Sequence, residues 1–556
     1  MKTRIYTGVL AAALLGLGSC SDYLDMTPTD EVSDKTVWSS LSGAEYAVNY
    51  FYHITDYFSP YYDDSDGGQC TAGMTEGLTD MIKYGDTNYS KNHYIPSEMS
   101  YGEDAVLTAN YVAVYLGNWT EVYEKVRRVN EALSNLYQYA TFDQADKTRL
   151  EAELRFFRGM LYFDLVKRYK EVIIYDRDLS QIQPNVALST EEQGWQFVYD
   201  DLTFAGENLP VDKTSNGRVT SGAAYALLCR AMLYAERWPD ARDAGKKVIN
   251  MQLYDLAPTY PEAFTSNGIE AIWEYDYNAA NSVYTTWDNL YAPGGDMTAD
   301  GNAQNGGLAT PTQEMVESFE LANTGGFPDW TPWHSTTGTE AEPPYAQLEP
   351  RFAASVLYNG SQWKGRTIEP FVGGADGWCE WYVEKSANGR TTTGYYLKKL
   401  VDESHSFNTI QNGTAPWIDM RYAELLLNYA EACYHTGDVT DANEAVRKVR
   451  GRVGLPYTDQ SGDNLMAAIR QERKVELMCE GYYYWDMRRW GLSSTAFTGI
   501  RRHGLKIERQ ANGSFVYTYV EVDHKDMNFP TKMYQCPLPS AEIDGNQLVD
   551  QYPEWQ

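Results

Sequence analysis

Aromatic and short polar side chains are mixed in two stretches of the sequence that lack a regular hydrophobic period. In one of them, Tyr284, Trp287 and Tyr291 surround the pair Asp288 and Asn289. A sugar ring has an apolar C–H face and a rim of hydroxyl groups, so its recognition needs a flat aromatic surface with hydrogen-bonding groups at the edge. We therefore predict that ligand is bound by Tyr84, Tyr89, Tyr284, Trp287, Asn289, Tyr291, Trp330 and Trp333. Peptides also use aromatic pockets with polar rims, and a peptide is the alternative ligand.

Residue types that usually carry catalysis or hold a metal are scattered along the chain. The seven histidines include no pair at helical spacing, and no C-x-x-C, phosphate-loop or nucleophile-elbow motif occurs. Residues 63–68 (DDSDGG) faintly resemble a calcium loop, but the EF-hand spacing and its closing glutamate are missing. We predict no catalytic residue, no metal site and no cofactor, with structural calcium left open. An exported hydrolase is the enzymatic alternative, because two carboxylates could be hidden among 77 acidic residues.

The N-terminus has the features of an export signal. Lys2 and Arg4 precede an apolar stretch over residues 8–17, which is too short to span a bilayer. The following residues 17–20 (LGSC) resemble a bacterial lipobox, in which the signal is cleaved before the cysteine and the thiol is acylated. We predict a signal peptide over residues 1–19, lipid attachment at Cys20, and a polar tether over residues 20–35. A lipid tether to a membrane follows from that prediction.

The charge balance limits the partners. The formal net charge of the 556-residue chain is −31, and no run of basic residues occurs. Nucleic acid is therefore excluded as a partner, because phosphate binding needs clustered positive charge. Acidic polysaccharides are disfavoured as well, unless the fold builds a local basic pocket.

The elements that must position these residues are predicted to be helices. Residues 158–162 (RGMLY), 230–234 (RAMLY) and 430–434 (AEACY) close three similar helices, and the first two of these motifs are 72 positions apart, close to twice the tetratricopeptide period of about 34. Helical pairs are expected over residues 36–251, including one junction capped by Thr141. Further helices are expected over 418–435, 439–452 and 463–484. Between residues 252 and 418 the helical period fails and glycine, proline and tryptophan are frequent. We predict a mainly α fold, a tetratricopeptide-like hairpin solenoid over 36–251 and 419–556, interrupted by a loop-rich, aromatic insertion over 252–418.

The C-terminal helices carry extended motifs. Residues 420–432 read MRYAELLLNYAEA, residues 469–477 read IRQERKVEL, residues 480–491 read EGYYYWDMRRWG, and residues 536–543 read CPLPSAEI. These motifs resemble signatures of the SusD/RagB family of outer-membrane nutrient-binding lipoproteins. The resemblance implies a helical fold with four tetratricopeptide-like hairpins, and a lid role over a SusC-like TonB-dependent transporter.

Several charged and aromatic residues are better explained as parts of the scaffold than as ligand-binding residues. Glu472, Glu476 and Glu480 are spaced four residues apart, and we expect them to be buried and paired with Arg421, Arg473 or Arg488. Trp119 and Trp273 are expected in the core. An arginine of the sequence Arg488-Arg489-Trp490 is expected to stack on an indole.

Together these features predict a cell-surface lipoprotein that binds oligosaccharides without chemical turnover. It would pass them to the TonB-dependent transporter.

Overall fold

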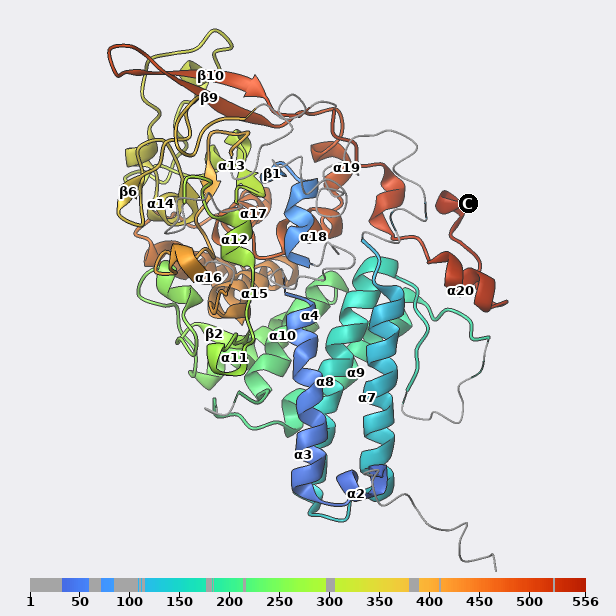
Figure 1. Ribbon diagram of the computed structural model, residues 1–556. Coiled ribbons are helices and arrows are strands. Elements are labelled where there is room, and N and C mark those ends of the chain that lie inside the picture. Colours follow the sequence, from blue (N-terminus) through green and yellow to red (C-terminus); the bar gives the residue numbers. More distant parts are fainter. Residues whose placement is uncertain are drawn as a thin grey trace, which may run out of the picture.

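A computed structural model describes residues 33–59, 72–84, 109, 112, 116–176, 183, 185–213, 217–296, 306–379, 390–409, 412–523 and 526–556, with only the backbone described for 72–74 and 84. Eight long helices form its framework (Figure 1). They are α7 (Trp119–Tyr139), α8 (Gln144–Tyr169), α9 (Glu191–Asn208), α10 (Ser221–Tyr234), α11 (Trp238–Met251), α15 (Tyr422–Thr436), α16 (Val439–Arg452) and α17 (Gly462–Glu476). No helix in the described ranges combines the length and apolar character needed to cross a bilayer.

Consecutive helices pack against one another along this framework. Each helix from α7 to α11 contacts the next, and α11 then contacts α15, although the whole insertion lies between them in sequence. The series continues through α16 and α17, and the shorter α3 (Leu41–Asn49) packs beside α7 and α8 (Figure 1). The predicted mainly α solenoid, interrupted by a loop-rich segment, is therefore confirmed.

Local sequence signals explain where these helices begin and end. Thr190 and Gln193 form a reciprocal capping box at the start of α9, which satisfies two otherwise unpaired backbone groups. Thr220 caps α10 by accepting a hydrogen bond from the Ala223 amide. Gly437 ends α15 in the left-handed region, with φ of 84°.

The segment between α11 and α15 contains only short elements. Its two ends are joined by β2 (Ala271–Tyr275), which pairs antiparallel with β8 (Trp417–Arg421). The other antiparallel pairs are β1 (Ile82–Tyr84) with β3 (Ala309–Pro311), β4 (Val356–Leu357) with β7 (Tyr396–Leu397), β5 (Gln362–Trp363) with β6 (Arg366–Thr367), and β9 (His503–Arg509) with β10 (Phe515–Glu521). Strands β9 and β10 form a hairpin whose turn contains Asn512 and Gly513.

The remaining helical elements are short. The α-helices are α2 (Asp34–Trp38), α4 (His53–Tyr57), α12 (Trp287–Tyr291), α13 (Gln313–Val316), α14 (Pro350–Ser355), α18 (Tyr483–Arg489), α19 (Ser493–Ala496) and α20 (Ser540–Gly545). The 3-10 helices are η1 (Tyr50–Tyr52), η2 (Ala72–Leu78), η4 (Pro261–Phe264), η5 (Ala279–Asn281), η6 (Thr331–Trp333), η7 (Tyr345–Gln347), η8 (Phe407–Thr409), η9 (Thr531–Tyr534) and η10 (Pro553–Trp555).

Three local predictions are wrong. The helix expected over residues 418–435 begins only at Tyr422, because residues 417–421 form strand β8. The helix expected over residues 463–484 is broken into α17 and α18, because Cys479 and Gly481 adopt φ angles of 58° and 84°, which no right-handed helix accommodates. The cap of α8 is Asp143, whose carboxylate accepts from the Ala145 amide, and the Thr141 hydroxyl donates instead to the Ser39 carbonyl oxygen.

A buried ion network joins the insertion to the C-terminal helices. Arg421 contacts Glu476 at 2.6 Å, Glu480 at 2.7 Å and Glu270 at 2.8 Å. Arg351 of the insertion contacts Glu472 at 2.5 Å and Glu476 at 2.9 Å. The scaffold role of the three glutamates is therefore confirmed, with a correction to two partners. Arg473 pairs with Asp486 and Arg488 contacts none of the three.

Candidate functional site

The structure places the predicted ligand residues of α12 inside the protein. Trp287, Asn289 and Tyr291 expose only 3%, 6% and 2% of their surfaces, and the two rings pack with centroids 4.0 Å apart. Asp288 between them accepts from the Asp402 amide at 3.0 Å and contacts the His405 ring at 2.7 Å. These contacts connect the loop of residues 402–405 to the helix. The exposure that a stacking platform requires is therefore not found at these three residues.

The other predicted residues differ in accessibility. Trp330 is buried at 5% exposure against Trp333, which is half-buried and donates its indole N–H to the Ala341 carbonyl oxygen. Tyr284 keeps 39% of its surface exposed. Tyr284 and Trp333 thus retain accessible ring surface, and their role in binding stays a prediction. Cys20, Tyr89 and the side chain of Tyr84 lie outside the described residues.

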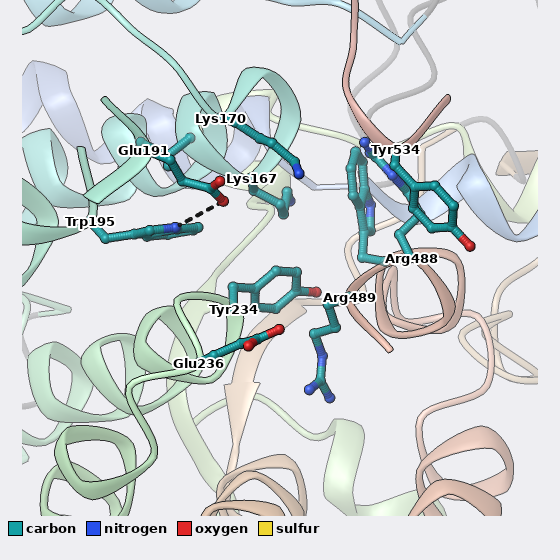
Figure 2. Close-up of a pocket in the computed structure, with 11 residues that line it drawn as sticks. Lys167, Lys170, Glu191, Trp195, Tyr234, Glu236, Arg488, Arg489 and Tyr534 are labelled. Atoms are coloured by element: carbon teal, nitrogen blue, oxygen red, sulfur yellow. Dashed lines mark hydrogen bonds between the residues drawn. The ribbon is translucent and has the colours of Figure 1, made fainter. Parts of the chain in front are cut away.

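A pocket of about 180 Å³ lies where α8, α9, α10 and α18 meet η9 (Figure 2). Four aromatic rings and six charged side chains, together with Val166, form its wall. They are Trp195, Tyr234, Trp485 and Tyr534, with Lys167, Lys170, Glu191, Glu236, Arg488 and Arg489. Tyr234 and Tyr534 are half-buried, whereas Trp195 and Trp485 are almost fully covered.

Helix ends position these side chains. Lys170 follows the last turn of α8 in the left-handed region, with φ of 62°, and its amide donates to the Val166 carbonyl oxygen. Glu191 and Trp195 lie one turn apart at the start of α9, and the indole N–H donates to the Glu191 carboxylate at 3.4 Å (Figure 2). Tyr234 is the last residue of α10. The pocket is therefore made by the ends of hairpins, where side chains are no longer held between helices.

Two of the four cations of the pocket are already neutralised by carboxylates. Arg489 contacts Glu431 at 2.7 Å and Asp486 at 2.8 Å. Lys167 contacts Asp164 at 3.1 Å, yet burial lowers the pKa of Lys167 to about 8. Arg488 stacks on Trp485 with 4.7 Å from its guanidinium carbon to the ring centroid. Within the described residues, no carboxylate pairs with Arg488, and neither of its terminal nitrogens has a hydrogen-bond partner.

The pocket wall is equipped to bind a ligand. Among the described residues that line it there is no serine, cysteine or histidine. It combines ring surfaces with four cationic donors and the two acceptors Glu191 and Glu236 (Figure 2). Such a lining suits a ligand with several hydroxyl groups and one apolar face.

Comparison with known proteins identifies the fold. A family model described as "SusD family" matches residues 269–555, and one described as "Starch-binding associating with outer membrane" matches residues 69–233. The chain belongs to the SusD family. A SusD-like protein of Bacteroides ovatus is 23% identical over 100% of this chain and 96% of its own length.

Solved structures agree with the family membership. A SusD-like protein of Bacteroides fragilis matches with a TM-score of 0.79 and 26% identity, over 95% of this chain and 99% of its own. A SusD-like carbohydrate-binding protein of the same species matches with a TM-score of 0.76 and 22% identity, over 93% and 100%.

The pocket of this SusD-family protein was missed by sequence reasoning. Its wall is assembled from residues 166–170, 191–195, 234–236, 485–489 and 534, which no local pattern connects. One signal was present, in the adjacent arginines 488 and 489. Arg489 does stack on Trp490, at 4.9 Å, as expected. The sequence does not show that the neighbouring Arg488 has no carboxylate to pair with.

Proposed function

We propose that the protein is a surface lipoprotein of the outer membrane that binds oligosaccharides without altering them. The observation that carries this proposal is the pocket at the hairpin ends, in a chain of the SusD family. A similar solved protein from Bacteroides fragilis is described as carbohydrate binding, which supports the same ligand class here.

The pocket suits one unit of a longer chain. Its volume of about 180 Å³ is below the roughly 300–1,000 Å³ of sites that enclose a whole drug-sized ligand. The half-buried rings of Tyr234 and Tyr534 offer contact to the C–H face of a sugar. The carboxylates of Glu191 and Glu236 can accept hydrogen bonds from hydroxyl groups, and Lys170 can donate to ring oxygens.

Anchoring and delivery complete the proposal. Acylation at Cys20 would hold the protein at the membrane, and a SusC-like TonB-dependent transporter would receive the bound oligosaccharide. The Cys20→Ala variant should then move from the membrane fraction to the soluble fraction, because the tether has no apolar face of its own. Sedimentation of this variant with membranes from cells lacking the transporter would contradict the lipid anchor.

The ligand class is tested by titration calorimetry of the protein against neutral and acidic oligosaccharides and against peptides. Tyr234→Ala should weaken oligosaccharide binding at least tenfold, about 1.4 kcal/mol. Tyr284→Ala is the matched variant in the insertion, and it should weaken binding less than Tyr234→Ala does, because the Tyr284 ring is not part of the pocket wall. A loss confined to Tyr284→Ala would place the site in the insertion, and binding of peptides alone would overturn the proposed function.

A further inference from the structure

Arg488 differs from the other buried arginines of the described residues. Each of the others contacts at least one carboxylate: Arg158, Arg168, Arg230, Arg351, Arg421, Arg450, Arg473 and Arg502. Arg488 is 7% exposed, and its two terminal nitrogens are covered without a hydrogen-bond partner. Burying a charge without a counter-ion is unfavourable, so the absence of an anion beside this side chain needs an explanation.

The neighbours of Arg488 do not supply the missing negative charge. Its guanidinium lies over the rings of Trp485, at 4.7 Å, and Tyr484, at 5.6 Å. The thiol of Cys536 interacts with Arg488, but burial raises the pKa of that thiol, which therefore stays neutral. The indole N–H of Trp485 also has no acceptor among the described residues. Three buried donor nitrogens, two of Arg488 and one of Trp485, thus lie at one wall of the pocket.

A second cation lies on the same pocket. Lys170 follows the C-terminus of α8, is partly exposed, and forms no ion pair within the described chain. Figure 2 shows Lys170 and Arg488 on neighbouring walls, with Glu191 and Glu236 on the walls that face them. The two cations of the lining without a carboxylate partner among the described residues, Lys170 and Arg488, thus lie on neighbouring walls, whereas Lys167 and Arg489 are paired. A ligand that carries an anion at the edge near Arg488 and hydroxyl groups elsewhere matches this lining.

We propose that the pocket binds the carboxylate of an acidic sugar, a uronic acid unit of an oligosaccharide, through Arg488 and Lys170. This inference rests on the proposed function and narrows its ligand class. A guanidinium presents parallel donors that match the two oxygens of a carboxylate. For this contact the guanidinium donors must turn from the Trp485 ring toward the adjoining cavity. Glu191 and Glu236 then accept from the sugar hydroxyls.

Because the net charge of the chain is −31, an acidic ligand depends on the positive charge of this pocket. An acidic oligosaccharide is repelled by most of such a surface, so its binding requires a local site with uncompensated positive charge. Arg488 and Lys170 provide that charge without a competing carboxylate at ion-pair distance.

The test compares oligouronates with their methyl esters, which keep the same stereochemistry and lack the charge. Trimers of galacturonate, glucuronate and mannuronate are titrated by calorimetry into the full-length protein purified in detergent. At least one acid should bind ten times or more tightly than its ester. Arg488→Gln should abolish that difference.

The matched control is Arg470→Gln. The Arg470 guanidinium also stacks on an indole, that of Trp490 at 5.0 Å, but the side chain is not part of the pocket wall. This variant should keep the full preference for the acid. If Arg488→Gln lowers the melting temperature too far for titration, the partly exposed Lys170→Gln replaces it and should reduce the preference for the acid over its ester at least threefold.

The other outcomes separate the two proposals. Equal affinity for acid and ester, with binding still weakened by Tyr234→Ala, overturns the inference and leaves the proposed function standing. A preference for a sulfated oligosaccharide that depends on Arg488 overturns the assignment to a carboxylate. Absence of binding to every oligosaccharide overturns both proposals.

Discussion

Two buried glutamates have pKa values shifted in opposite directions by their neighbours. Burial raises the pKa of Glu76 to about 8, against which the hydrogen bond from the Gly481 amide, 2.7 Å long, acts only in part. Burial acts on Glu431 as well, but the charge of Arg489 outweighs it and lowers the pKa of Glu431 to about 2. Glu431 therefore stabilises the fold above its ordinary pKa of about 4.5, and this contribution is lost as the pH falls toward 2.

The sign is reversed for Glu76. Between pH 4.5 and 8 the unfolded chain releases this proton while the folded chain keeps it, so the folded state loses stability as the pH rises. Glu76→Gln should remove this loss, because the amide has the same shape and no charge. We expect the variant to match the wild type at pH 5 and to be more stable at pH 8.5, by several kcal/mol at about 1.4 kcal/mol per pKa unit.

Urea unfolding of both proteins at the two pH values measures this difference. Glu444→Gln on the exposed face of α16 is the control and should change stability by less than about 0.5 kcal/mol at either pH. Equal stability of Glu76→Gln and the wild type at pH 8.5 would show that Glu76 is ionised in the folded protein without cost.

At the scale of elements, close helix packing depends on individual glycines. A Cβ atom added to Gly206 in α9 would lie 2.6 Å from the ring of Tyr225 in α10. A Cβ atom added to Gly451 in α16 would meet nothing within 4 Å. Both glycines are inside helices, where alanine is favoured over glycine by roughly 1 kcal/mol.

This pair predicts opposite effects of one substitution. Gly206→Ala should destabilise by about 1–3 kcal/mol, because the Tyr225 ring must move out of a packed interface. Gly451→Ala should stabilise by roughly 0.5–1 kcal/mol. Chemical unfolding curves of the two variants measure both values, and a gain in stability for Gly206→Ala would mean that α9 and α10 are packed less closely than described.

Element type was predictable from sequence where the helical period is long. The spacing of Ala423, Leu426, Leu427 and Ala430 predicts α15, although residues 418–421 of the expected helix form β8, because strand β2 pairs with them. Burial inside the insertion was not predictable. Trp287 is buried next to Asp288, which contacts residues 402 and 405, and such long-range contacts leave no periodic signal.

The same limit applies to the candidate site. The sequence does not distinguish Arg488 from Arg489 beside it. Only the fold shows that Glu431 and Asp486 contact Arg489. The absence of a partner is a property of the surroundings, which no local pattern of residue types encodes.

At the scale of the whole molecule, the buried ion network connects the insertion with the solenoid. Glu476 contacts Arg351 of the insertion, Arg421 at the start of α15 and Arg452 at the end of α16. These charges hold the pKa of Glu476 well below its ordinary range, although burial alone would raise it. Glu270, which precedes strand β2, contacts two of these arginines, Arg421 and Arg452, at 2.8 Å each.

Glu476→Ala should therefore destabilise the entire protein rather than one part of it. Removing the carboxylate leaves three buried guanidinium groups with one acceptor fewer, and breaking a buried pair in this way costs about 3–5 kcal/mol. Because the network spans the insertion and the solenoid, the variant should still unfold in one transition, at lower urea concentration, with unchanged oligosaccharide affinity in its folded fraction.

The control is Glu444→Ala, at an exposed glutamate of the neighbouring α16, which should change stability by less than about 0.5 kcal/mol. Fluorescence and circular dichroism recorded on the same urea series test the single transition. A selective loss of oligosaccharide binding at unchanged stability would assign Glu476 to the ligand site instead of the scaffold.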